Sequence, residues 1–146
     1  MLLLPHTILD IRDDVTRRLL WRVPLREGST VDLEYTNSLF NAPTTDRFVV
    51  QGRALRLVEI SSTKEAVLEH AGLAGPHKIR AGRFVAERPG PVLAELTIRI
   101  GQTGQQRLVV DGRDMPLYRT GVGEAVHIRV ARIPRVLTLV ETPRPP

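Results

Sequence analysis

Hydrophobic and polar residues alternate with a period of two along most of this chain. Leu96, Ile98 and Ile100 alternate with polar residues, and the segments 19–23 and 126–130 follow the same pattern. This alternation is typical of antiparallel strands that turn one face toward a core and the other toward solvent. The pattern predicts strands at 7–12, 19–23, 30–37, 47–51, 54–60, 82–87, 96–100, 106–111, 126–130 and 136–141.

Turn residues separate these segments. Asp111-Gly112 is the clearest hairpin signal, because both central residues of a type I′ turn need a positive φ angle. Short strands separated by turns predict an all-β fold, a sandwich or flattened barrel of about eight to ten mostly antiparallel strands. We expect residues 1–146 to form a single domain, with residues 142–146 as a frayed, proline-rich tail.

One short helix is predicted at about 63–71. Ser62 and Glu65 have the spacing of a capping box, in which two side chains accept hydrogen bonds from free backbone N–H groups. Good helix formers follow, and Gly72 suits the position just after the helix C-terminus. We expect the glycine-rich segment 72–82 to be a mobile loop.

Composition narrows the chemistry that the chain can carry out. The net charge is +5, and arginine supplies nearly all of the positive charge, since Lys64 and Lys78 are the only lysines. Arginine pairs with carboxylates and phosphates, so anionic partners are compatible with this composition. Arginines on solvated strand faces explain it equally well. The absence of cysteine excludes disulfides, cysteine-ligated zinc and thiol chemistry.

No segment approaches the ~20 apolar residues that a membrane-spanning helix needs. The N-terminal "MLLLPHT" is also far shorter in its apolar part than the core of a signal peptide. These features predict no membrane span. They also predict either a cytoplasmic location or a chain from which a signal has been removed.

Ser38 is the one serine that we consider as a catalytic nucleophile. It could meet a histidine and Asp46 in space, but no G-x-S-x-G elbow surrounds it. Serine and aspartate in loops more often close turns through local hydrogen bonds. We therefore predict no catalytic residue, and a hydrolase that uses Ser38 is the third hypothesis.

The histidines give weak signals for a metal site. His70 and His77 flank the glycine-rich segment, with Glu65 and Glu69 nearby, but the H-E-x-x-H motif is absent. A histidine at the end of a helix is favoured by the negative helix terminus without any metal. We predict no metal and no cofactor. His127 alternates with core positions and is expected to face solvent.

A basic β module that binds nucleic acid or another polyanion is the second hypothesis. Proteins that bind single strands use aromatic side chains as stacking platforms, and this chain has few aromatic residues, several of them at core positions. The arginines that could converge on one sheet face are Arg99, Arg107, Arg113, Arg129, Arg132 and Arg135.

The segment 32–48, "DLEYTNSLFNAPTTDRF", begins as a strand and then becomes polar. The alternation places Tyr35, Asn37 and Leu39 on the core face. An amide there must be hydrogen-bonded or open to a pocket, because an unpaired buried amide costs on the order of 1–3 kcal/mol. Asn37 and Asp46 could equally well satisfy the backbone of the loop.

The same segment carries a motif: Tyr35-Thr36-Asn37-Ser38, then Pro43, Asp46 and Phe48. With it, residues 8–130 resemble a family of small bacterial domains of unknown function. Genes of that family commonly accompany TRAP-type transporters that use TAXI solute-binding proteins. The family usually has histidine where this chain has Asn37 and glutamate where it has Asp46. The resemblance implies a cell-envelope or transporter-linked role.

We therefore predict a non-enzymatic accessory domain that binds a small ligand or a protein partner such as a transporter component. The predicted ligand-binding residues lie at the rim of the strand end, and the segment 62–77 would act as a lid. They are Tyr35, Asn37, Ser38, Asp46 and Glu65.

Overall fold

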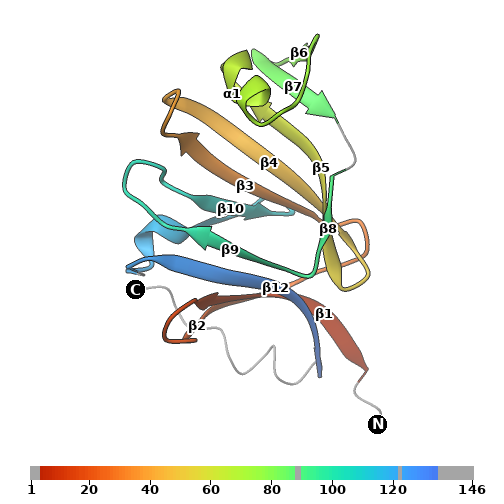
Figure 1. The fold of residues 1–146 in the computed structure, drawn as a ribbon. Helices are drawn as coiled ribbons and strands as arrows, with labels where there is room; N and C mark the ends of the chain where they lie inside the picture. The colour runs from red at the N-terminus through yellow and green to blue at the C-terminus, as the bar shows by residue number, and fades with distance from the viewer. Residues whose placement is uncertain (1–3, 88–89, 122, 135–146) are drawn as a thin grey trace.

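The computed structural model describes residues 4–87, 90–121 and 123–134 (Figure 1). The fold is all-β, as predicted, and consists of two antiparallel sheets that do not close into a barrel. The smaller sheet has four strands among the described residues. In spatial order they are β2 (Leu19–Pro24), β1 (Pro5–Asp13), β12 (Ala125–Pro134) and β9 (Glu95–Arg99).

The larger sheet has eight strands within the same ranges. Its order is β11 (Arg113–Pro116), β10 (Arg107–Val110), β3 (Thr30–Asn37), β4 (Ala42–Gln51), β5 (Ala54–Ser62), β7 (Arg83–Glu87) and β6 (Lys78–Arg80), with β8 (Val92–Leu93) also paired to β5.

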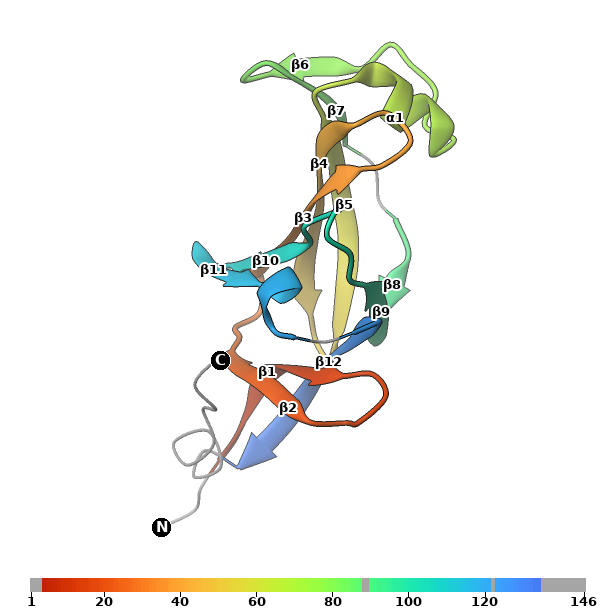
Figure 2. The ribbon, with the colours of Figure 1, turned by 90° about the vertical axis from the view of Figure 1, so that its left-hand side faces the viewer.

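The hydrophobic core fills the space between the two sheets. Each sheet contributes one face, and Ile11, Leu55, Leu108 and Ile128 are almost fully buried there. The end of the larger sheet with β6, β7 and helix α1 (Glu65–His70) extends away from the smaller sheet (Figures 1 and 2). That end of the larger sheet therefore depends on α1 and nearby loops for cover.

Most of the predicted strands are confirmed, and β4 is longer than expected. Thr44, Thr45 and Asp46 belong to β4, which begins at Ala42, so the second half of the polar part of segment 32–48 is strand, while residues 38–41 form a turn. Three short strands, β6, β8 and β11, escaped prediction because two to four residues carry little periodicity. The predicted strand 136–141 and the tail 142–146 lie outside the described residues.

The expectation of a mobile loop at 72–82 is wrong for its second half. Residues Lys78–Arg80 form β6, which pairs with β7 across a two-residue turn. That turn, Ala81-Gly82, has φ angles of 51° and 74°. It is a hairpin turn whose alanine gives a weak sequence signal, since alanine rarely adopts positive φ.

The Asp111-Gly112 hairpin is confirmed. The two residues have φ angles of 46° and 84°, and Val110 pairs with Arg113 on either side of them. The turn thereby brings β11 against β10.

Replacing Gly112 with valine is expected to lower the free energy of unfolding by about 1–2 kcal/mol, because a side chain with a Cβ is strained at positive φ. No atom lies within 4 Å of an added Cβ, so strain and not collision causes the loss. Gly101→Ala is the matched control, because Gly101 has equal space and no positive φ. Urea denaturation of both variants tests this, and equal losses would contradict it.

Helix α1 follows the predicted position, but its N-terminus lacks the capping box. Lys64 is the N-cap residue and makes no side-chain cap. The Ser62 hydroxyl instead donates to the Pro43 carbonyl oxygen at 3.1 Å. At the C-terminus Gly72, with a φ of 80°, donates to the Glu69 carbonyl oxygen at 3.0 Å, as predicted for a glycine after a helix.

Other helical structure is limited to a 3₁₀ turn, η1 (Leu117–Arg119), within the described ranges. Across those ranges no helix has the length and apolar character needed to cross a membrane.

The outer face of the smaller sheet contains a cluster of charges around a buried carboxylate. Asp10 is 1% exposed and alternates with core residues of β1. The Nε atoms of Arg12, Arg22 and Arg129 lie 2.9, 3.5 and 3.9 Å from its oxygens. His127 lies on the same face and is buried, so the expectation that it faces solvent is wrong. Its Nε2 is 3.1 Å from Glu95 Oε2.

Candidate functional site

Asn37 closes a turn. Its Oδ1 accepts hydrogen bonds from the backbone N–H groups of Leu39 and Phe40, at 3.1 and 3.2 Å. The strand ends at Asn37, so the alternation does not continue, and Leu39 is 65% exposed instead of facing the core. Ser38 is exposed in the same turn. Asn37 therefore satisfies the backbone of the loop, which was the alternative to a pocket-facing amide.

Tyr35 and Asp46 come together across β3 and β4. The Tyr35 hydroxyl donates to Asp46 Oδ1 at 3.2 Å. Burial raises the pKa of Asp46 to about 6, and the bond from Tyr35 offsets only part of that effect. Burial and the nearby Asp46 carboxyl raise the pKa of Tyr35. At neutral pH the Asp46 carboxylate is therefore charged in a buried position, which is unfavourable.

Glu65 lies apart from both groups and binds a histidine. Its Oε1 is 2.9 Å from His77 Nδ1, and His77 Nε2 is 2.8 Å from the Leu73 carbonyl oxygen. The predicted lid does touch the β3–β4 turn, since Lys64 Nζ donates to the Phe40 carbonyl oxygen at 2.6 Å. The structure thus distributes the predicted site residues over three places.

Neither a triad nor a metal cluster forms around these residues. Ser38 makes no hydrogen bond to any of the four histidines, all of which the structure describes. His70 instead packs edge-on against Phe40, with ring centroids 5.7 Å apart. No group of three potential metal ligands occurs among residues 4–87, 90–121 and 123–134.

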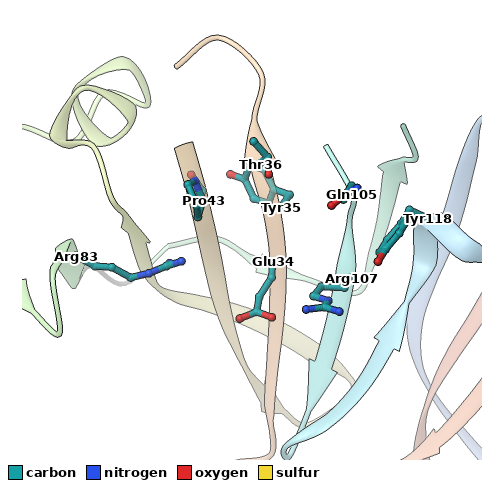
Figure 3. A pocket seen from close by; sticks show the side chains of 9 residues that line it. Glu34, Tyr35, Thr36, Pro43, Arg83, Gln105, Arg107 and Tyr118 are labelled. Atoms are coloured by element: carbon teal, nitrogen blue, oxygen red, sulfur yellow. The ribbon is translucent and has the colours of Figure 1, made fainter. Parts of the chain in front are cut away.

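A hollow of about 260 Å³ opens beside Tyr35, on the face of the larger sheet turned away from the core (Figure 3). Strands β3, β4, β7 and β10 and the turn η1 surround it. The residues that line it are Glu34, Tyr35, Thr36, Pro43, Thr44, Arg83, Gln105, Arg107 and Tyr118.

Loop contacts fix the rim of this hollow. The Thr36 N–H donates to the Gly104 carbonyl oxygen at 2.8 Å, which joins the β9–β10 loop to the C-terminal end of β3. The Tyr118 N–H donates to the Gln106 carbonyl oxygen at 3.2 Å. The Arg119 guanidinium lies 5.3 Å from the centroid of the Tyr118 ring, a cation–π distance. Tyr118 is therefore held at the edge of the hollow.

Charges of both signs meet in the hollow without neutralising one another. Glu34 lies between Arg83 and Arg107 (Figure 3), and it makes no ion pair with any described residue. Within the described part of the chain, Arg83 Nη1 donates to the hydroxyls of Thr45 and Ser61, at 3.1 and 3.4 Å, and pairs with no carboxylate. A cation and an anion therefore remain available side by side.

Arg107 is only partly satisfied. Its Nη2 pairs with Asp114 Oδ2 at 3.1 Å, while its Nε is buried and has no hydrogen-bond partner in the described part of the chain. Glu34 and Arg107 are directly opposite in the register of β3 and β10. Buried polar atoms are usually hydrogen-bonded, so Arg107 is incompletely paired. Because Nε is enclosed by the protein, a ligand would meet the exposed part of this side chain, which lines the hollow.

No pattern in the sequence predicts this hollow. Glu34 and Arg107 alternate with the core residues Leu33 and Leu108, a pattern that fits any solvated strand face. Only the pairing of β3 with β10 brings them together. The two strands are far apart in the sequence, and neither segment alone predicts that they pair. Tyr35 is the one predicted site residue that lines the hollow.

The arginines considered for polyanion binding do not gather on one face. Arg107 pairs with Asp114, Arg129 approaches Asp10, and Arg135 lies outside the described residues. The exposed ones belong to different sheets and are Arg99, Arg113, Arg129 and Arg132. No observation favours this hypothesis over ligand binding, and it stays a prediction.

A scan against protein-family models, a search of curated proteins and a search of solved structures find no match to this chain. The resemblance of residues 8–130 to the transporter-linked bacterial family stays a prediction that these comparisons do not test. The function is therefore inferred from the geometry of the hollow beside Tyr35.

Proposed function

We propose that this protein binds a small zwitterionic solute of the amino-acid type in the hollow beside Tyr35. One observation carries the proposal: Arg83, Glu34 and Arg107 stand next to one another without forming an ion pair among themselves. A ligand with one acidic and one basic group would neutralise both signs at once.

Each charged residue has a defined role in this proposal. The exposed part of the Arg107 guanidinium and the Arg83 guanidinium would donate to the carboxylate of the ligand, because guanidinium groups match carboxylates in geometry. The unpaired Glu34 carboxylate would accept from its ammonium group. Tyr118 and Gln105 at the rim would contact the remainder of the solute.

The size of the hollow supports a small solute. Its volume of about 260 Å³ is just below the ~300–1,000 Å³ typical of pockets for drug-sized ligands. The lining is rich in hydrogen-bonding groups, which suits a polar molecule. A solute-binding role also agrees with the transporter-linked role that the family resemblance implies, and we propose that role as the context of the protein.

Replacing Arg107 with glutamine is expected to weaken amino-acid binding at least tenfold, because a hydrogen bond to a charged group contributes about 1.5–3 kcal/mol. Isothermal titration calorimetry with a panel of amino acids measures this. Arg113→Gln is the matched control, since Arg113 is exposed on the neighbouring strand and outside the hollow. It removes the same charge and is expected to leave affinity unchanged.

Two further probes separate the roles of the charges. An N-acetylated amino acid lacks the ammonium group, so it is expected to bind more weakly than its parent and to lose nothing further in Glu34→Gln. If no amino acid binds, or if Arg107→Gln and Arg113→Gln behave alike, the proposed site is wrong.

A further inference from the structure

A second hollow, apolar in character, lies at the far end of the larger sheet. It measures about 270 Å³. Ile60 on β5 is opposite Asp46 on β4 and opposite Ala86 on β7. Residues opposite one another in neighbouring strands point to the same face, and for these three it is the core-side face of the sheet. The apolar hollow therefore lies on that face. The zwitterion hollow lies on the other face. The residues that line the apolar hollow are Leu57, Glu59, Ile60, Ala71, Leu73, Ala86, Gly90 and Pro91.

We propose that this apolar hollow is a binding site for an aliphatic chain, and that His77 holds one of its walls in place. The proposal is independent of the zwitterion site. An apolar cavity of ~150 Å³ accommodates benzene, so this larger hollow suits a chain of roughly eight carbons.

The lining explains why the ligand is aliphatic. Leu57, Ile60, Leu73 and Pro91 supply apolar surface, and burial of each methylene of a chain against them is favourable. Glu59 is the one charged residue of the lining, and its carboxylate is already paired with Arg80. No charge in the lining is therefore left for a ligand to neutralise.

Small residues create the space. Ala71 at the end of α1, Ala86 on β7 and Gly90 meet where larger side chains would close the hollow. Gly90 donates to the Leu57 carbonyl oxygen at 2.8 Å, and a Cβ at Gly90 would lie only 2.9 Å from Leu57 Cβ. Glycine is therefore what allows the segment at 90–91 to form a wall so close to β5.

His77 fixes the opposite wall through Leu73. The Leu73 carbonyl oxygen and Glu65 Oε1 are 2.8 and 2.9 Å from the two ring nitrogens. Both partners are acceptors, so both nitrogens must carry a hydrogen, which requires the charged imidazolium. Loss of that proton removes one of the two bonds and releases the link between α1 and Leu73.

The charges around His77 favour the protonated ring. Glu65 and Glu69 approach it from α1, and the bond from Glu65 is the largest cause that raises its pKa above 6.5. On the side of β6 and β7, Lys78 and Glu87 pair with each other at 3.1 Å. The wall is therefore complete while His77 is charged and loosens as pH rises through its pKa.

Methyl NMR with 1-octanol as an uncharged probe tests the proposal. We expect saturable shifts of the Leu57, Ile60 and Leu73 methyl groups, with those of the core residue Ile11 unchanged. Ala86→Leu fills the hollow and is expected to weaken octanol binding at least tenfold. Ala94→Leu, at an exposed alanine outside the hollow, is the matched control and is expected to bind like the wild type.

The role of His77 has its own readout. Octanol affinity is expected to fall several-fold from about pH 6 to about pH 9 in the wild type, and to be weaker and independent of pH in His77→Gln. Ala71→Leu replaces Ala86→Leu if the latter does not fold. The proposal is overturned if octanol gives no saturable shifts, or if the filled variants bind it as the wild type does. An identical pH profile in His77→Gln overturns the role of His77.

Discussion

Replacing Asp10 with asparagine is expected to lower the free energy of unfolding by about 3 kcal/mol, the low end of the cost of breaking a buried ion pair. The Asp10 side chain is 2% exposed, and three arginines converge on it from β1, β2 and β12. Asparagine keeps the shape but removes the carboxylate with which all three arginines pair. The positive charges would then repel one another across the outer face of the smaller sheet.

Asp14→Asn is the matched control for this effect. Asp14 pairs with Arg17 at 3.6 Å, but both side chains are exposed, and such pairs contribute about 0–1 kcal/mol. Denaturant unfolding of both variants at neutral pH measures the difference. Equal and small losses for the two would show that the Asp10 cluster is not a structural charge network.

The second large effect is a loss of stability as pH rises from about 4 to about 6, caused by Asp46. Burial raises the pKa of this carboxyl from 3.8 to about 6 in the folded protein. The folded state therefore holds more protons than the unfolded chain across this window, so stability falls as pH increases. Such a change in pKa corresponds to roughly 3 kcal/mol.

Asp46→Asn isolates this contribution. Asparagine keeps an acceptor for the Tyr35 hydroxyl and carries no charge. The variant is expected to match the wild type near pH 4 and to be more stable than it at pH 7, by as much as roughly 3 kcal/mol. Urea unfolding at several pH values measures both proteins. Parallel profiles would mean that the Asp46 carboxyl is solvated.

The sequence predicts the architecture well because the alternation of apolar and polar residues reflects burial directly. Strands such as β9 and β12 show it over several residues, and the Asp111-Gly112 turn adds a local backbone requirement. The short strands β6, β8 and β11 lack that length. Their position depends on pairing with longer neighbours, which no short segment encodes.

The site was harder to predict for a related reason. Asn37 was predicted as a ligand-binding amide on the core face. The strand ends there, however, and the Asn37 side chain closes a turn. Glu34 was not predicted, and Arg107 was considered only as one of the arginines for polyanion binding, because each follows the pattern of a solvated face. Their significance comes from the register between β3 and β10, where two opposite charges face each other without pairing.

NMR of the arginine Nε–Hε groups during an amino-acid titration tests whether the hollow between Arg83, Glu34 and Arg107 binds a small zwitterion. We expect the Arg83 and Arg107 signals to shift with one common saturation curve, because both line the hollow. The signals of Arg99 and Arg113, which lie outside it, are expected to stay in place. Small, unsaturable shifts of equal size at all four arginines would show that the hollow does not bind the zwitterion.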